Sequence, residues 1–225
     1  MREASKTRES KETNITVKLN IDGSGESRIN SGIGFLDHML ELFAFWGHFD
    51  LEITTKEADF KVDIHHANED LGIVLGQVFK LALGDKKGIN RIGDASVPME
   101  EVTVTVSLDI SGRGSFKISG AIKGIAKEQS DYVDFGKLYD RIRKVDPADA
   151  VKPMQENYRL EYAEHFFDAF AKQLGMNLNI KIENASNDLH TSLEPVFKAL
   201  GKALSEAVGI DPRRKGIPST KGVID

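Results

Sequence analysis

The sequence predicts an α+β fold that arose by internal duplication, with strands and two helices in each half. The main observation is a pair of similar clusters, His65–Glu69 and His190–Glu194, each of which comes just before an apolar helical pattern. A second observation is that the pairs Asp37-His38 and Glu164-His165 precede the two clusters at nearly the same distance. A repeat of this length indicates that one structural unit occurs twice.

The composition limits the class of protein. The chain has 225 residues, of which 40% are hydrophobic, so it can bury a good core as one large domain or two fused halves. There is no cysteine, which excludes a disulfide framework and a thiolate metal site. The net charge of -5 does not favour nucleic-acid binding. No apolar run reaches membrane-spanning length and Met1–Glu9 is not a secretory signal, so we expect a cytoplasmic protein without nucleic-acid or membrane partners.

The first repeat half is expected over residues 1–90. Alternating apolar residues predict a strand over Glu12–Ile21, and the turn Asp22–Gly25 predicts a hairpin into Glu26–Ile29. A helix, two strands and a second helix are expected next, over Phe35–Trp46, Phe49–Thr55, Phe60–Ile64 and Leu71–Leu83. The turn residues of Gly84–Gly88 end the last helix.

The second repeat half is expected over residues 91–225. The predicted order is strand, strand, helix, strand and helix, over Val102–Ile110, Ser115–Ile122, Tyr158–Leu174, Asn177–Ile182 and Pro195–Val208. A charged insertion at about 124–157, with a short helix over Lys137–Lys144, interrupts this half, and Pro212–Gly222 forms a basic tail. We expect residues 12–90 and 102–207 to superpose, with His38 over His165 and His65 over His190.

The residue types of the clusters favour metal binding. On a helix, His65 and Glu69 lie on one face and can hold one cation, whereas His66 points about a quarter of a turn away. His66 therefore suits a second metal or a neighbouring subunit. Imidazole with carboxylate suits Mn, Fe or Zn. A lone histidine pair is more often a surface or core pair, but the second copy, His190 with Glu194, favours metal ligands.

Further motifs accompany these clusters along the chain. Together with the clusters, they occupy the segments Gly32–Leu40, Asp63–Asp70, Gly84–Arg91, Pro98–Glu101, Asp109–Arg113, Glu164–Phe167, Glu194–Ala199 and Pro218–Gly222. Any one motif is weak, whereas the set, which runs from about Glu12 to Val223, is highly specific. The set resembles the imidazoleglycerol-phosphate dehydratase family of histidine biosynthesis.

The resemblance implies a ribosomal protein S5 domain 2-like fold and a metal-dependent lyase that dehydrates imidazole glycerol phosphate to imidazole acetol phosphate. It also implies two Mn²⁺ ions per active site. The assembly would be a homo-oligomer of about 24 chains with active sites shared between chains. The proton removed in this reaction is not acidic, so the substrate ring must act as an electron sink. Two cations bound to the ring nitrogens would stabilise the negative charge that the ring takes up.

The resemblance also assigns residues. The implied metal ligands are His38, His65, His66, Glu69, His165, His190 and Glu194. The implied catalytic residues are Glu12, Glu69 and Glu194, with Glu12 as the first candidate for moving the proton. The implied substrate-binding residues are Glu12, Arg91, Arg113, Lys198, Ser219, Thr220 and Lys221, whose basic and hydroxyl groups suit a phosphate.

The chain departs from the family pattern at three places. Thr191 stands where the family has a second histidine, Trp46 stands where a histidine is usual, and the segment at 124–157 is longer. Threonine is a poor ligand for Mn²⁺, so one metal site is expected to be weakened. An alternative function is therefore a catalytically weak family member that acts as a metal-dependent assembly protein. A metal-dependent hydrolase is a further alternative, which would need an open metal position beside a base.

Overall fold

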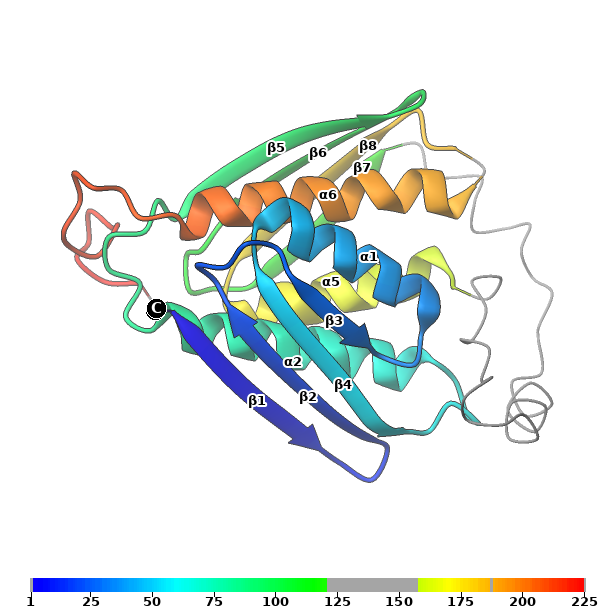
Figure 1. Cartoon of the computed structure of the whole chain (residues 1–225). Helices are drawn as coiled ribbons and strands as arrows, with labels where there is room; N and C mark the ends of the chain where they lie inside the picture. The colour runs from blue at the N-terminus through cyan, green and yellow to red at the C-terminus, as the bar shows by residue number, and fades with distance from the viewer. Residues whose placement is uncertain (1, 121–157, 187, 225) are drawn as a thin grey trace.

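The structure is a computed structural model that describes residues 2–120, 158–186 and 188–224. In this part of the chain, two four-stranded sheets form the outer layers and four helices lie between them (Figure 1). The predicted α+β fold with duplicated halves is confirmed. The predicted insertion at 124–157, with its short helix over Lys137–Lys144, lies outside the described residues, as do the last two residues of the predicted strand Ser115–Ile122.

The first half supplies one sheet with the strand order β1-β2-β4-β3. Strand β2 pairs antiparallel with β1 and β4, and β3 pairs parallel with β4. The strands are β1 (Glu3–Glu9), β2 (Thr13–Asn20), β3 (Ser27–Asn30) and β4 (Asp50–Ala58), and the helices are α1 (Gly34–Gly47) and α2 (His65–Leu83).

The second half repeats this plan with the strand order β5-β6-β8-β7 and the same pattern of antiparallel and parallel pairs. Strands β2 and β6 even share one alternation of buried and accessible residues, because each is the second strand from the edge of its sheet and faces the helix layer with every other side chain. The elements are β5 (Ile92–Met99), β6 (Val102–Asp109), β7 (Ser115–Gly120), β8 (Asn177–Glu183), α5 (Leu160–Leu174) and α6 (Leu189–Val208).

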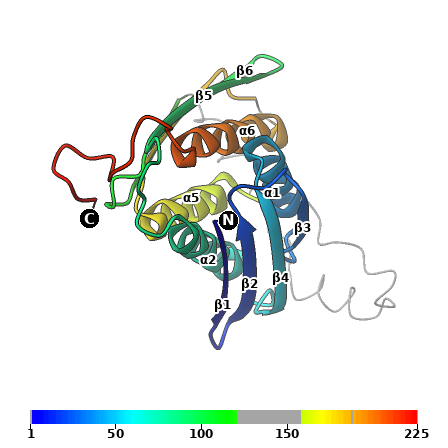
Figure 2. The same cartoon turned by 60° about the vertical axis from the view of Figure 1, so that its left-hand side comes forward.

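The helix layer joins the halves, because α1 packs on α6 and α2 packs on α5. All four helices begin at the same end of the molecule, on the right in Figure 1, and Figure 2 shows them stacked between the sheets. Phe43, Phe79 and Phe170, from α1, α2 and α5, are buried with ring centroids 5.7–6.2 Å apart. The aromatic core is therefore shared by the two halves. No helix of the described residues is long and apolar enough to cross a membrane.

The first strand of each half, β1 or β5, is not predicted by the sequence pattern. Both lie at the edge of their sheets, and β1 has no fully buried residue. The one apolar residue of β1 is Ala4, and the buried residues of β5 are Gly93 and Ala95, so the hydrophobic alternation of both strands is too weak to recognise.

The predicted hairpin between Glu12–Ile21 and Glu26–Ile29 is wrong, because β3 pairs with β4 and β4 lies between β2 and β3. The carboxylate of Asp50 accepts hydrogen bonds from the backbone N–H groups of Ser24, Gly25 and Glu26 and holds this turn against the start of β4. These bonds, the Ser24 N–H first, hold the pKa of Asp50 below its usual value. A side chain distant in sequence therefore decides where the turn leads.

Two other predicted elements need correction. Residues Phe60–Ile64 form a turn rather than a strand, because the ring of Phe60 packs against Gly32 instead of entering the sheet. Helix α6 begins at Leu189, before the predicted start at Pro195. Asp188 causes this earlier start, since its side chain accepts hydrogen bonds from the N–H groups of His190 and Thr191 as an N-cap.

Gly76 and Gly201 lie where helices of the two halves cross, and their lack of a side chain allows the helices to approach closely. A Cβ atom at Gly76 would lie 2.7 Å from the carbonyl oxygen of Phe170, and one at Gly201 would lie 2.5 Å from that of Phe43. We expect Gly76→Ala and Gly201→Ala each to lower the free energy of unfolding by about 1–3 kcal/mol through overpacking. Chemical denaturation measures this, with Gly216→Ala as the control because nothing lies within 4 Å of that site. Equal stability of all three variants would contradict close helix packing.

Candidate metal centre

The first histidine cluster combines one helix from each half. His38 on α1 meets His190 and Glu194 on α6, and the ligand atoms of all three lie within 4.8 Å of one another. His190 Nε2 lies 2.6 Å from Glu194 Oε2, and His38 Nε2 lies 3.7 Å from the same oxygen. Two imidazoles and one carboxylate oxygen therefore converge at the start of α6.

Glu194 also contacts a lysine through its second oxygen, because Lys198 Nζ lies 2.5 Å from Oε1. Burial opposes ionisation of this carboxyl group, but the hydrogen bonds from Lys198 and His190 outweigh it and hold the pKa of Glu194 below its usual value. The site thus pairs an ionised carboxylate with two imidazoles. This set of donors is suited to a divalent transition-metal ion.

The second cluster has the same residue types with the halves exchanged, but its three ligand atoms do not converge within 4.8 Å as those of the first cluster do. His65 and Glu69 on α2 meet His165 on α5. The Nδ1 atoms of His65 and His165 are 3.0 Å apart, and His65 Nε2 lies 3.3 Å from Glu69 Oε2. The predicted common face of His65 and Glu69 is therefore present. The two ring nitrogens of His65 face different partners, so its ring would have to turn to share one ion with both.

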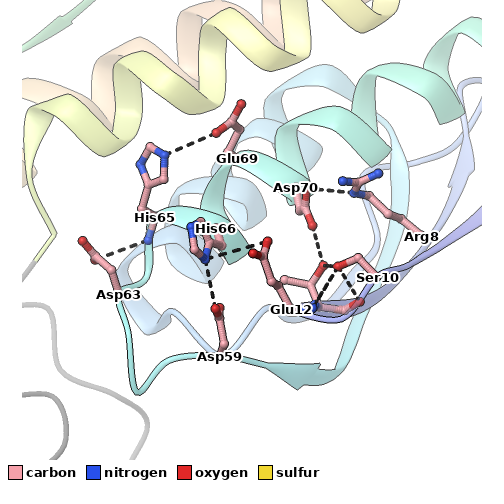
Figure 3. A network of polar contacts seen from close by, with 10 residues as sticks. Arg8, Ser10, Glu12, Asp59, Asp63, His65, His66, Glu69 and Asp70 are labelled. Atoms are coloured by element: carbon pink, nitrogen blue, oxygen red, sulfur yellow. Dashed lines mark hydrogen bonds and ion pairs between the residues drawn. The ribbon is translucent and has the colours of Figure 1, made fainter.

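His66 lies in a third group, with Asp59 and Glu12 (Figure 3). Its Nδ1 atom is 2.9 Å from Asp59 Oδ2 and 3.9 Å from Glu12 Oε2. The hydrogen bond to Asp59 raises the pKa of His66 above its usual value. Among the described residues of one chain, His66 is therefore separate from the site of His38, His190 and Glu194.

Glu12 is presented to His66 by the turn between β1 and β2. Ser10 Oγ accepts hydrogen bonds from the backbone N–H groups of Glu12 and Thr13, at 3.1 and 3.0 Å. Buried Asp70 on α2 then holds the turn, since it accepts a hydrogen bond from Thr13 Oγ1 and pairs with Arg8 Nε at 2.7 Å (Figure 3). The half-exposed carboxylate of Glu12 is therefore held beside His66, at the start of α2.

Thr191 is buried and bound within its own helix end. Its Oγ1 donates a hydrogen bond of 2.8 Å to Asp188 Oδ2, the N-cap side chain of α6. The hydroxyl group therefore adds to the N-cap that stabilises the helix start.

A buried polar network, which the sequence pattern does not reveal, joins the start of α2 to the start of α5. Tyr158 donates to Asn68, Asn68 donates to the carbonyl of Tyr162, and Tyr162 donates to Asp63, over 2.6–2.9 Å. Burial and the bond to Asp63 raise the pKa of Tyr162 to about 12. Tyr158 and Tyr162 have helical spacing and read as ordinary core residues, so only their distant partners identify the network. Asp59 was missed as well, because no local pattern links it to His66.

The predicted phosphate-binding residues lie mostly at the other end of the helices. Arg91 forms a two-point salt bridge with Asp109, at 2.6 and 3.0 Å, and donates to the carbonyl of Pro218 in the C-terminal tail. The backbone N–H of Arg91 donates to Ala207 O near the end of α6. The tail with Ser219, Thr220 and Lys221 is therefore held beside Arg91, on the left in Figure 1.

Helix α6 separates these groups from the first cluster. Because an α-helix rises ~1.5 Å per residue, the stretch from His190 to Ala207 spans roughly 25 Å. Arg113 also lies at the far end, in the turn where Gly112 N–H donates to Gly175 O after α5. Of the predicted phosphate contacts, Lys198 alone reaches a histidine cluster within the described part of one chain.

Comparisons with known proteins agree with the motifs. The family model "Imidazoleglycerol-phosphate dehydratase" matches residues 31–145 and 132–204. The chain is 44% identical to imidazoleglycerol-phosphate dehydratase of Thermoanaerobacter pseudethanolicus and 43% identical to that of Methanocella arvoryzae, each over 100% of both chains.

Solved structures give the same result for the fold. The dehydratase from Staphylococcus aureus has a TM-score of 0.69 at 27% identity and matches 93% of this chain and 99% of its own. The enzyme from Pyrococcus furiosus has a TM-score of 0.70 at 28% identity and matches 97% of this chain and 99% of its own. The likeness therefore covers both halves of the duplication.

Proposed function

Because the chain belongs to the imidazoleglycerol-phosphate dehydratase family and is a lyase of histidine biosynthesis, we propose that its two histidine clusters bind divalent metal ions for this dehydration. The single observation that carries the proposal is that each cluster joins the His-x-x-x-Glu pair of one half to the lone histidine of the other. We also place the enzyme in the cytoplasm, as its cysteine-free sequence predicts.

The donor sets fit the proposed ions. The first site would take His38, His190 and Glu194, and the second would take His65, Glu69 and His165. Nitrogen and carboxylate oxygen donors without thiolates suit Mn²⁺, which we propose as the native ion. Two such ions, when bound, would stabilise negative charge on the substrate imidazole ring during loss of water.

The protein itself would hold and move the proton. Glu12, whose half-exposed carboxylate lies beside His66, is our candidate for transferring the proton from the carbon next to the leaving hydroxyl group. Glu69 and Glu194 would hold the metals in place for the reaction. Lys198 would keep Glu194 ionised and oriented, because its ammonium group occupies the second carboxylate oxygen.

The phosphate group of the substrate would be bound by Arg91, Arg113, Ser219, Thr220 and Lys221. Since roughly 25 Å of α6 separates Arg91 from the first cluster, a substrate shorter than this distance cannot contact both in one chain. We therefore propose that each active site combines the histidine clusters of one chain, at the start of its helices, with Arg91 and the C-terminal tail of another chain. His66 would reach the metal of a neighbouring chain in the same assembly, for which the family suggests about 24 copies.

The alternative of a catalytically weak assembly protein rests on Thr191. Thr191 follows His190 as His66 follows His65, so in the proposed assembly it would face the second site, that of His65, Glu69 and His165, in a neighbouring chain. Its hydroxyl group is bonded to Asp188, so the ion at that site would lack the imidazole that the family supplies from this position. Family membership favours the lyase over this alternative, and both clusters keep three donor residues each. Turnover separates the two functions directly.

Purified protein with Mn²⁺ should convert imidazole glycerol phosphate to imidazole acetol phosphate. Chelation of the metal should abolish turnover, and His190→Ala should lower it by at least about 100-fold because it removes a metal ligand. His48→Asn is the control, since His48 is exposed at the end of α1, outside the clusters, and asparagine tolerates its positive φ. Full metal binding without turnover in the unaltered protein would support the assembly protein instead.

Mixed assemblies should reveal shared active sites. His190→Ala lacks a metal ligand and Lys221→Ala lacks a phosphate contact, so each variant alone should have little activity. When the two are co-expressed with different tags, random mixing should give roughly a quarter of the sites both intact sets. The assemblies are purified through both tags before turnover is measured. Activity that stays at the average of the two variants would show that each site belongs to one chain.

Restoring the missing imidazole should strengthen the weaker metal site. We expect Thr191→His to raise the Mn²⁺ affinity of that site by an order of magnitude or more, the size of typical ligand-shell effects. Thr191→Val is the matched control, because it removes the bond to Asp188 without adding a ligand. Titration followed by electron paramagnetic resonance counts both sites. Two equal and tight sites in the unaltered protein, unchanged by Thr191→His, would contradict a role of this position at a metal.

A further inference from the structure

Among the described residues, the carboxylate of Asp59 forms its one hydrogen bond with the ring of His66. Asp59 directly follows β4 and His66 is the second residue of α2, so the turn between them brings the two side chains together (Figure 3). Asp59 Oδ2 and His66 Nδ1 are 2.9 Å apart, a normal hydrogen-bond distance.

Asp59 has no other evident structural task among the described residues. Its Oδ1 atom is buried and has no hydrogen-bond partner there. The neighbouring acids differ, because Asp63 accepts from Tyr162 and Asp70 binds Thr13 and Arg8. Burying a carboxylate oxygen without a partner costs free energy, so the position is poor for stability alone. The contact with His66 is the interaction that accounts for this side chain.

A hydrogen bond from Nδ1 to a carboxylate fixes a histidine in two ways. It keeps the proton on Nδ1, which leaves the lone pair on Nε2, and it stops rotation of the ring. In the described part of the chain, Nε2 of His66 has no polar partner, and the side chain is 35% exposed. Its free nitrogen is therefore available to a group outside this chain.

We propose that Asp59 is a positioning residue that orients His66 as a metal ligand for a neighbouring chain. This inference rests on the proposed function, in which His66 completes a metal site shared between chains. Asp59 would act through the imidazole and would not touch the metal or the substrate. Carboxylates that hold a metal-binding histidine in this way contribute strongly to metal affinity.

The competing arrangement is an ion held directly by Glu12, Asp59 and His66, whose ligand atoms lie within 4.8 Å of one another. In that arrangement Glu12 and Asp59 would be equivalent ligands. The observed distances favour the positioning role, because Nδ1 lies at hydrogen-bond distance from Asp59 and 3.9 Å from Glu12. Glu12→Gln distinguishes the two arrangements by metal affinity.

The experiment is a Mn²⁺ titration of the full-length protein by calorimetry, with the assembly state followed by light scattering. We expect Asp59→Ala to weaken one site by about 10–100-fold and to weaken assembly in parallel. The Mn²⁺ affinity of Asp59→Asn should lie between those of the unaltered protein and Asp59→Ala, since the amide oxygen of asparagine still accepts a hydrogen bond from Nδ1. Glu57→Ala is the matched control, because it removes an exposed carboxylate from the same strand end, and it should bind as the unaltered protein does.

The double variant tests whether Asp59 acts through His66. In a His66→Ala background, adding Asp59→Ala should cause no further loss of affinity. A further loss of similar size would overturn the inference, and so would unchanged affinity of Asp59→Ala or an equal loss in Glu12→Gln. If the unaltered protein binds two ions and dehydrates its substrate while Asp59→Ala binds equally well, only the inference fails. If the unaltered protein binds no Mn²⁺, the proposed function fails with it.

Discussion

The packing of α1 on α6 and of α2 on α5 is the constraint on which the rest of the structure depends. Each sheet is covered by the two helices of its own half, and each pair takes one helix from either half, so the two helix layers pack on each other between the sheets. The close approach at Gly76 and Gly201 sets the crossing points, and the buried rings of Phe43, Phe79 and Phe170 fill the space between them. Both histidine clusters depend on this packing between the halves, because the lone histidine and the His-x-x-x-Glu pair of each cluster come from different halves.

The direction of the helices separates two kinds of chemistry. All four helices begin at one end, where imidazoles and carboxylates gather, and the arginine-held tail lies where α6 ends. A rigid helix of this length keeps the two groups apart within a chain. The proposed reaction needs both groups around one small substrate, so association of several chains would be part of the active site itself.

The duplication is close in the sheets and incomplete at the ligands. Strands β2 and β6 have the same burial pattern, and the two clusters have matching helix positions. His66 and Thr191 break this symmetry, since the first contacts Asp59 and the second contacts Asp188. In the proposed enzyme the two metal ions would therefore have unequal surroundings. Asp59 would matter only in the half that keeps the second histidine.

The sequence by itself determined the duplicated α+β plan, the family and the helical faces that carry His65 with Glu69 and His190 with Glu194. These depend on short-range periodicity and on motifs, which sequence reports directly. Strands β1 and β5 were not predictable, because the less exposed residues of β1 and the buried residues of β5 are small or charged and show little apolar alternation. Only the tertiary structure decided the pairing of β3 with β4, the union of each cluster across the halves, and the contact of Asp59 with His66. Those features join residues far apart in the chain or separated by an irregular turn, and packing of the whole helix layer fixes them.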